Sequence, residues 1–239
     1  MQEQLNKKMP LDKILIEGLN YCNKNLQKLI GFMGINYIIC GAMAYYWKTF
    51  YLWPLLLILY VLWSVGFRYY FERKPYFDGE ALFSSLVPST KIVVLSVMVV
   101  SLFLLLPIAV LFVPILPDDF MKAYALFLQK NMQETDAVDM VINLILVIFS
   151  PQILYRPMLA WIASLLGRSG SLSLAWEKTQ GNYWNFLLLA IIINLSLTMV
   201  YNVILWIGGS IYVALIPISV LVIYFNVVLA RIYTFFFLE

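Results

Sequence analysis

The sequence predicts an all-α, polytopic integral membrane protein with six transmembrane helices and amphipathic helices on the cytoplasmic side. Of the 239 residues, 63% are apolar and 12% are charged, whereas about 25% of the residues of a soluble domain are charged. Six stretches approach the roughly 20 apolar residues that one bilayer crossing needs. These stretches are apolar on all sides, while a helix of a soluble core is apolar along one stripe.

The predicted spans are, in chain order, residues 29–47, 53–70, 92–116, 138–155, 186–207 and 210–236. The second and the fourth are the shortest. The fifth and the sixth meet at Gly208 and Gly209, where the connection is short enough for only a tight hairpin turn.

The first 28 residues are predicted to form an amphipathic helix that lies on the cytoplasmic interface and leads into the first span. They lack the apolar region and the cleavage site of a signal peptide. Instead, apolar residues recur at helical spacing between Lys and Asn residues. They are Leu11, Ile14, Leu15, Leu19, Leu26, Leu29 and Ile30.

Two connecting segments are long enough to hold helices of their own. Residues 117–137 form the large outer loop, in which Asp118 or Asp119 can cap a surface helix. Residues 157–166 are apolar but too short to span. They are predicted either to continue the fourth span into the cytoplasm or to lie in the membrane plane. Ser171 or Ser173 is expected to cap the helix that follows.

The distribution of Lys and Arg predicts the orientation of the chain. With six spans, thirteen of the 16 Lys and Arg residues fall on the side of the two termini. Since cytoplasmic loops carry the excess of basic residues, both termini are expected in the cytoplasm.

Residues 1–239 form one predicted membrane domain, within which we interpret residues 11–71, 76–155 and 172–237 as three repeats of one helix-hairpin unit. In each unit a small residue followed by a large one opens a helix that leads into an odd-numbered span, and each even-numbered span exits through an arginine beside aromatic residues. The alternative is coincidence, because any membrane hairpin favours a cation at its inner end. The opening pairs are Gly18-Leu19, Ala81-Leu82 and Ala175-Trp176, and the closing residues are Arg68, Arg156 and Arg231.

The composition excludes several classes of site. The chain has no histidine, and Cys22 and Cys40 lie far apart, so we expect neither a metal site nor a cofactor. The net charge of +3 is too small and too dispersed for nucleic-acid binding. A hydrolytic cluster of Glu17, Glu80 and Glu177 is conceivable if the three units converge, but solvated helix faces explain these residues more simply.

Two groups of residues are the candidate sites. Arg68, Arg156 and Arg231 would form a ring at the cytoplasmic interface, suited to lipid phosphates or serving only as anchors. The second group is polar and lies within the spans, where its side chains either join helices by hydrogen bonds or line a pocket. It comprises Asn194, Thr198, Asn202 and Asn226.

The segment "SLSLAWEKTQGNYWNFLLLAII" resembles a signature of small six-span bacterial inner-membrane proteins. The group includes the membrane domain attached to some glycerophosphodiester phosphodiesterases and related uncharacterised families. The resemblance implies a location in the bacterial inner membrane, but no catalytic residue, and the soluble phosphodiesterase domain has no counterpart here. It rests on Leu174, Ala175, Trp176, Thr179, Gly181, Asn182 and Trp184.

We therefore predict a non-enzymatic accessory or scaffold protein. It would engage anionic lipid, a partner protein or a second copy of itself through its cytoplasmic helices. The alternative is a small transporter for a lipid-like or uncharged solute, with a cavity opened by proline-kinked spans. The prolines concerned are Pro107, Pro114, Pro151 and Pro217.

Overall fold

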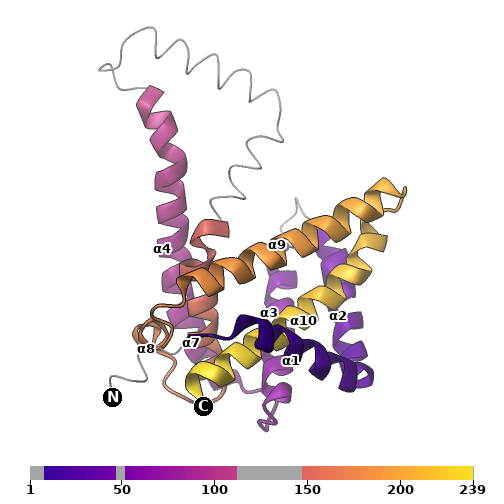
Figure 1. The fold of residues 1–239 in the computed structure, drawn as a ribbon, viewed down its shortest axis with the longest axis horizontal. Helices are drawn as coiled ribbons and strands as arrows, with labels where there is room; N and C mark the ends of the chain where they lie inside the picture. Colours follow the sequence, from indigo (N-terminus) through magenta and orange to yellow (C-terminus); the bar gives the residue numbers. More distant parts are fainter. Residues whose placement is uncertain (1–7, 47–51, 112–146, 239) are drawn as a thin grey trace.

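The computed structural model describes residues 8–46, 52–111 and 147–238, and over these ranges the chain is helical and holds no strand (Figure 1). The predicted all-α class is thus confirmed. The predicted outer loop, with Asp118 and Asp119, lies outside the described residues. The elements are α1 (Leu11–Lys24), α2 (Leu26–Tyr45), α3 (Leu52–Tyr70), α4 (Gly79–Leu111), η2 (Pro151–Tyr155), α7 (Arg156–Leu165), α8 (Leu172–Lys178), α9 (Tyr183–Trp206) and α10 (Ile211–Phe237).

Three helices, α2, α9 and α10, are long and apolar enough to cross a membrane, and they coincide with the predicted first, fifth and sixth spans. In α2 and α9, only 17% and 11% of the residues in the most apolar 18-residue stretch are buried, so most of these side chains are at least partly exposed. Exposed apolar area on this scale is unfavourable in water and favourable in lipid. The chain is therefore a membrane-associated protein.

The structure describes the other three predicted spans wholly or in part. The second coincides with α3, a helix of 19 residues. The third forms the latter part of α4, whose 33 residues run on through Pro88 without a break. Half of the fourth lies outside the described residues, which resume at residue 147 and lead through η2 directly into α7. Residues 156–165 thus continue the helix formed by residues 147–155.

The helix ends follow from local hydrogen bonds. The Asp78 carboxylate accepts from the Glu80 and Ala81 amides at 3.1 and 3.2 Å and so caps α4. Ser171 accepts from the Leu174 amide at 3.2 Å, which confirms it as the cap of α8. Gly181, with φ +79°, provides the left-handed residue between α8 and α9.

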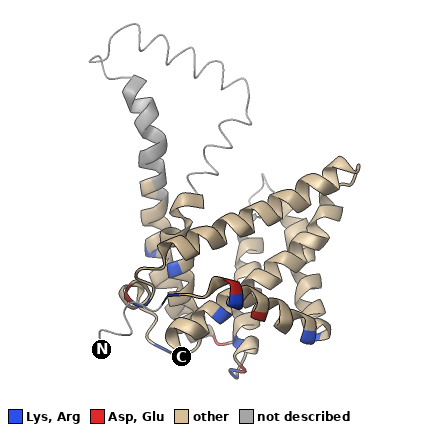
Figure 2. Cartoon of the chain, in the orientation of Figure 1, with Lys and Arg blue, Asp and Glu red and all other residues tan. Residues whose placement is uncertain are grey.

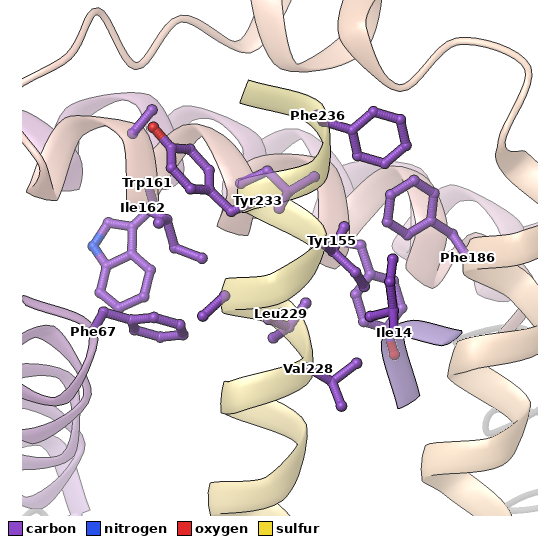
Figure 3. Packing of buried hydrophobic residues seen from close by; sticks show 14 of the residues in the cluster. Ile14, Phe67, Tyr155, Trp161, Ile162, Phe186, Val228, Leu229, Tyr233 and Phe236 are labelled. Carbon is purple, nitrogen blue, oxygen red and sulfur yellow. The ribbon is translucent and has the colours of Figure 1, made fainter. Parts of the chain in front are cut away.

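The core is built around α7, in which Leu159, Ile162 and Leu165 are completely buried. Side chains of α10 pack against it, and the close-up in Figure 3 shows Tyr233 and Leu229 of that helix turned toward the same cluster. The centre of the molecule is therefore packed with side chains from elements far apart in the sequence.

Helix α1 packs closely on α10 because Gly18 has no side chain. A Cβ at Gly18 would lie 2.9 Å from Val228 Cγ2 and 3.4 Å from Tyr224 Cε2. One turn earlier, the Tyr224 hydroxyl donates to the Leu15 carbonyl at 3.0 Å. The small residue that opens the first predicted unit is thus a packing residue.

Replacing Gly18 with Leu should detach α1 from α10 and expose Cys22, which is buried between the two helices. Burial raises the pKa of the Cys22 thiol, so the docked thiol reacts slowly with maleimide. Overpacking costs about 1–3 kcal/mol, and about 1.4 kcal/mol is a tenfold change, so we expect labelling of Cys22 to be about tenfold faster.

The measurement uses a Cys40→Ser background, in which Cys22 is the remaining cysteine. Gly34→Leu is the matched control, because nothing lies within 4 Å of a Cβ added there. Equal labelling rates in the two variants would contradict the role given to Gly18.

Candidate functional site

Charged residues gather at one end of the helices. Figure 2 shows Lys, Arg, Asp and Glu of the described chain around α1, the start of α4 and the end of α10, while the opposite ends of α9 and α10 are free of charge. The sequence agrees, since no charged residue lies between Lys178 and Arg231. Charged residues at one end of long apolar helices are the arrangement expected of a protein in a membrane, where the charges lie at the interface and the apolar segments lie in the hydrocarbon region.

Arg68, at the end of α3, is almost completely buried and points into the protein. Its Nε donates to the Pro75 carbonyl at 2.8 Å, and its Nη1 donates to the Leu165 carbonyl at the end of α7. Its Nη2 lies 3.8 Å from the Asp78 carboxylate that caps α4. This arginine therefore joins α3, α4 and α7.

Arg156, the first residue of α7, is also buried. Its Nη1 donates to the Gln152 side chain, and its guanidinium carbon lies 4.1 Å from the ring centre of Trp176 in α8. This distance is within the range of a cation–π interaction. Like Arg68, Arg156 is engaged by protein groups.

Arg231, near the end of α10, is half-buried and lies beside a pair of aromatic rings. Its guanidinium carbon is 5.8 Å from the ring centres of both Tyr21 and Tyr70, which are themselves 4.8 Å apart. Its Nε is buried and has no hydrogen-bond acceptor within the described chain. Burial raises the pKa of the Tyr21 hydroxyl, so this phenol stays neutral beside the cation.

The polar residues of the spans separate into two places. On α9, Asn194 is half-buried, while Thr198 and Asn202 are exposed. Asn226, on α10, lines a pocket enclosed by α1, α2, α3 and α10, to which α9 contributes no residue.

That pocket is apolar and encloses about 500 Å³, part of it open to the surroundings. Beside Arg231, a second and polar recess of about 410 Å³ is lined by Lys13, Glu17 and Thr234. We call the two the apolar pocket and the polar recess. Aromatic side chains dominate the lining of the apolar pocket, namely Tyr21, Phe32, Trp63, Phe67, Tyr69 and Tyr70.

The carboxylates of the hydrolytic hypothesis lie in three different helices, α1, α4 and α8, and Glu17 lies 4.0 Å from Lys13. Within the described residues, no group of three or more His, Cys, Asp or Glu side chains could hold a metal ion.

Several buried polar residues were not among the predicted sites. The Asn182 carboxamide accepts from the Met9 amide at 2.8 Å, and Asn185 donates to the Met9 carbonyl at 3.1 Å, which fixes the start of α1 against α9. Asn36, fully buried in α2, accepts from Trp63 Nε1 at 3.4 Å. Asn194 became a candidate because it is an Asn within an apolar stretch, and Asn36 shows the same pattern.

Comparison with known proteins finds no matching family model, no matching curated protein and no matching solved structure. The resemblance to six-span inner-membrane proteins therefore stays a prediction.

Proposed function

We propose that the chain is a non-enzymatic accessory or scaffold protein of the bacterial inner membrane that engages anionic lipid, or a partner protein, through its cytoplasmic helices. The exposed face of α1 is the observation that carries the proposal. Ile16 and Leu19 are 60% and 53% exposed on this helix, and the exposed Lys13 and Lys24 lie near its two ends. Apolar side chains flanked by cations are typical of a helix that lies in the headgroup region of an anionic membrane.

The proposal includes six crossings, both termini in the cytoplasm and the three repeated units. The contacts of the closing arginines support the units. Arg68 contacts Asp78 at the start of α4, Arg156 contacts Trp176 of α8, and Arg231 contacts Tyr21 of α1. Each closing arginine thus reaches the helix that opens the next unit, and the last reaches the first. A scaffold is further supported by the packed centre around α7.

Enrichment of anionic lipid around the protein tests this function. We expect protein extracted in polymer-bounded membrane discs to carry more phosphatidylglycerol than the bulk membrane, because each basic residue near an anionic surface contributes about 1 kcal/mol. Replacing four exposed lysines with Gln should abolish the enrichment, and Arg at the same positions should preserve it. The four are Lys8, Lys24, Lys28 and Lys74, all outside the two cavities.

Wild-type protein without any enrichment would overturn the lipid function. The orientation is tested in the same membranes by placing single cysteines at Lys8 and Leu238 in a cysteine-free background. Both should react with an impermeant maleimide from the cytoplasmic side, and labelling from opposite sides would overturn the even number of crossings.

A further inference from the structure

We propose that the apolar pocket holds an acyl chain of one anionic glycerophospholipid, and that the phosphodiester of this lipid binds Arg231. The inference rests on the proposed lipid function and deepens it. A charged surface attracts anionic lipids collectively, whereas this site would bind a single molecule in a defined position.

Arg231 is the first step of the argument. Arg68 and Arg156 each donate to a protein oxygen, although the Nε of Arg156 is buried without an acceptor, whereas Arg231 donates to no oxygen of the described chain and its Nε is buried as well. A buried donor without an acceptor costs about 1–3 kcal/mol, and more when it is charged. A phosphodiester oxygen is an acceptor that matches guanidinium geometry and charge.

The polar recess gives the charge of the ligand. Its lining contains Arg231, Lys13 and Glu17, and the last two side chains lie 4.0 Å apart and offset each other. One positive charge therefore remains, that of Arg231. A single phosphodiester, with one negative charge, balances it.

The apolar pocket gives the rest of the ligand. Tyr21 and Tyr70, whose ring centres lie 5.8 Å from the Arg231 guanidinium, line this pocket, and Leu29, Phe32 and Trp63 are among its other lining residues. A site with a cation at its rim and an apolar interior is complementary to an amphiphile and not to a free anion.

Asn226 is the polar group that fits a glycerolipid in particular. It lines the apolar pocket and precedes Arg231 by five residues on α10, which is about 7.5 Å along a helix axis at 1.5 Å per residue. The ester carbonyls of a glycerophospholipid lie below its phosphate toward the acyl chains. At roughly 100° per residue Asn226 lies about 140° around α10 from Arg231, so it faces the apolar pocket and not the polar recess, and its amide can donate to an ester carbonyl there.

Native mass spectrometry of the full chain in detergent tests the site by titration with dioleoyl phosphatidylglycerol and dioleoyl phosphatidylcholine. We expect one phosphatidylglycerol per chain to bind more tightly than phosphatidylcholine. Hydrogen bonds to charged groups contribute about 1.5–3 kcal/mol, and about 1.4 kcal/mol is tenfold. Arg231→Gln should therefore raise the Kd for phosphatidylglycerol about tenfold or more. Arg73→Gln, which changes an exposed arginine outside both cavities, should leave it unchanged.

A second pair of variants tests the acyl chain independently of charge. Gly66 lines the apolar pocket, and a Cβ there would lie 3.7 Å from Phe32 Cε1, so Gly66→Leu places its side chain in the pocket. This variant should lose the single bound lipid. Gly34→Leu, whose site lies outside the pocket and has nothing within 4 Å of an added Cβ, should keep it.

Wild-type affinity in both Arg231→Gln and Gly66→Leu would overturn the site, even if the lysine-dependent enrichment of phosphatidylglycerol persists and the proposed function stands. Conversely, a loss of enrichment with the single bound lipid retained would remove the broader function and keep the site. Displacement of the lipid by glycerol 3-phosphate would also overturn the proposal, because it would show a headgroup site alone. If Arg231→Gln does not elute as folded protein, Arg231→Lys replaces it, with an expected loss of affinity because the planar fork of donors is absent.

Discussion

Replacing Arg68 with Ala is expected to lower the free energy of unfolding by about 1–3 kcal/mol, the cost of leaving a buried hydrogen-bonding group without its partner. The side chain is 6% exposed and donates to carbonyls of both Pro75 and Leu165. Its loss leaves these carbonyls and the Asp78 carboxylate without their cation. Equilibrium unfolding in mixed micelles, followed by tryptophan fluorescence, measures the change.

Arg73→Ala is the matched control. Arg73 is exposed, so its loss should change stability by no more than about 0.5 kcal/mol. Arg68→Lys should recover little of the loss, since one ammonium group cannot reproduce a planar guanidinium that bonds in several directions. Equal effects at Arg68 and Arg73 would show that the buried contacts contribute nothing.

Replacing Phe186 with Ala is expected to cost about 3–5 kcal/mol, because large-to-small changes in a packed core lose both transfer energy and contacts across the cavity. Phe186 is completely buried, and its ring lies 5.8 Å from that of Tyr155 and 6.2 Å from that of Phe236 (Figure 3). It joins the start of α9 to η2 and to the end of α10. The same unfolding measurement detects the loss.

Phe83→Ala makes the identical chemical change at a residue of α4 that is 74% exposed. We expect a loss of about 0.5 kcal/mol or less there. A loss at Phe83 as large as that at Phe186 would mean that contact with lipid, and not packing within the chain, sets the stability.

The long helices could be predicted because their signals are local. Runs of apolar residues located α2, α9 and α10, and the spacing of apolar residues located helix α1, although of its predicted apolar face Leu11 and Ile14 are buried in the protein and Leu19 is exposed. Each of these features depends on a stretch of sequence that is continuous along the chain. The third and fourth spans illustrate the limit, since α4 begins 13 residues before the third predicted span and the helix of the fourth runs on through η2 into α7.

The surroundings of the arginines could not be predicted in the same way. Arg68, Arg156 and Arg231 share a sequence pattern, yet their partners are a backbone carbonyl of α7, an indole of α8 and two phenol rings. Which partner each meets depends on how helices far apart in the sequence pack. The apolar pocket has the same origin, because its walls come from four separate helices.

The docking of α1 has a consequence for the order in which the chain folds during synthesis. Met9 is held by Asn182, Leu15 by Tyr224, and Gly18 packs on Val228. The ribosome makes the first residues of these pairs early and their partners near the end. Helix α1 must therefore wait, presenting Ile14 and Cys22 to the membrane surface or to a chaperone, until α10 has been inserted.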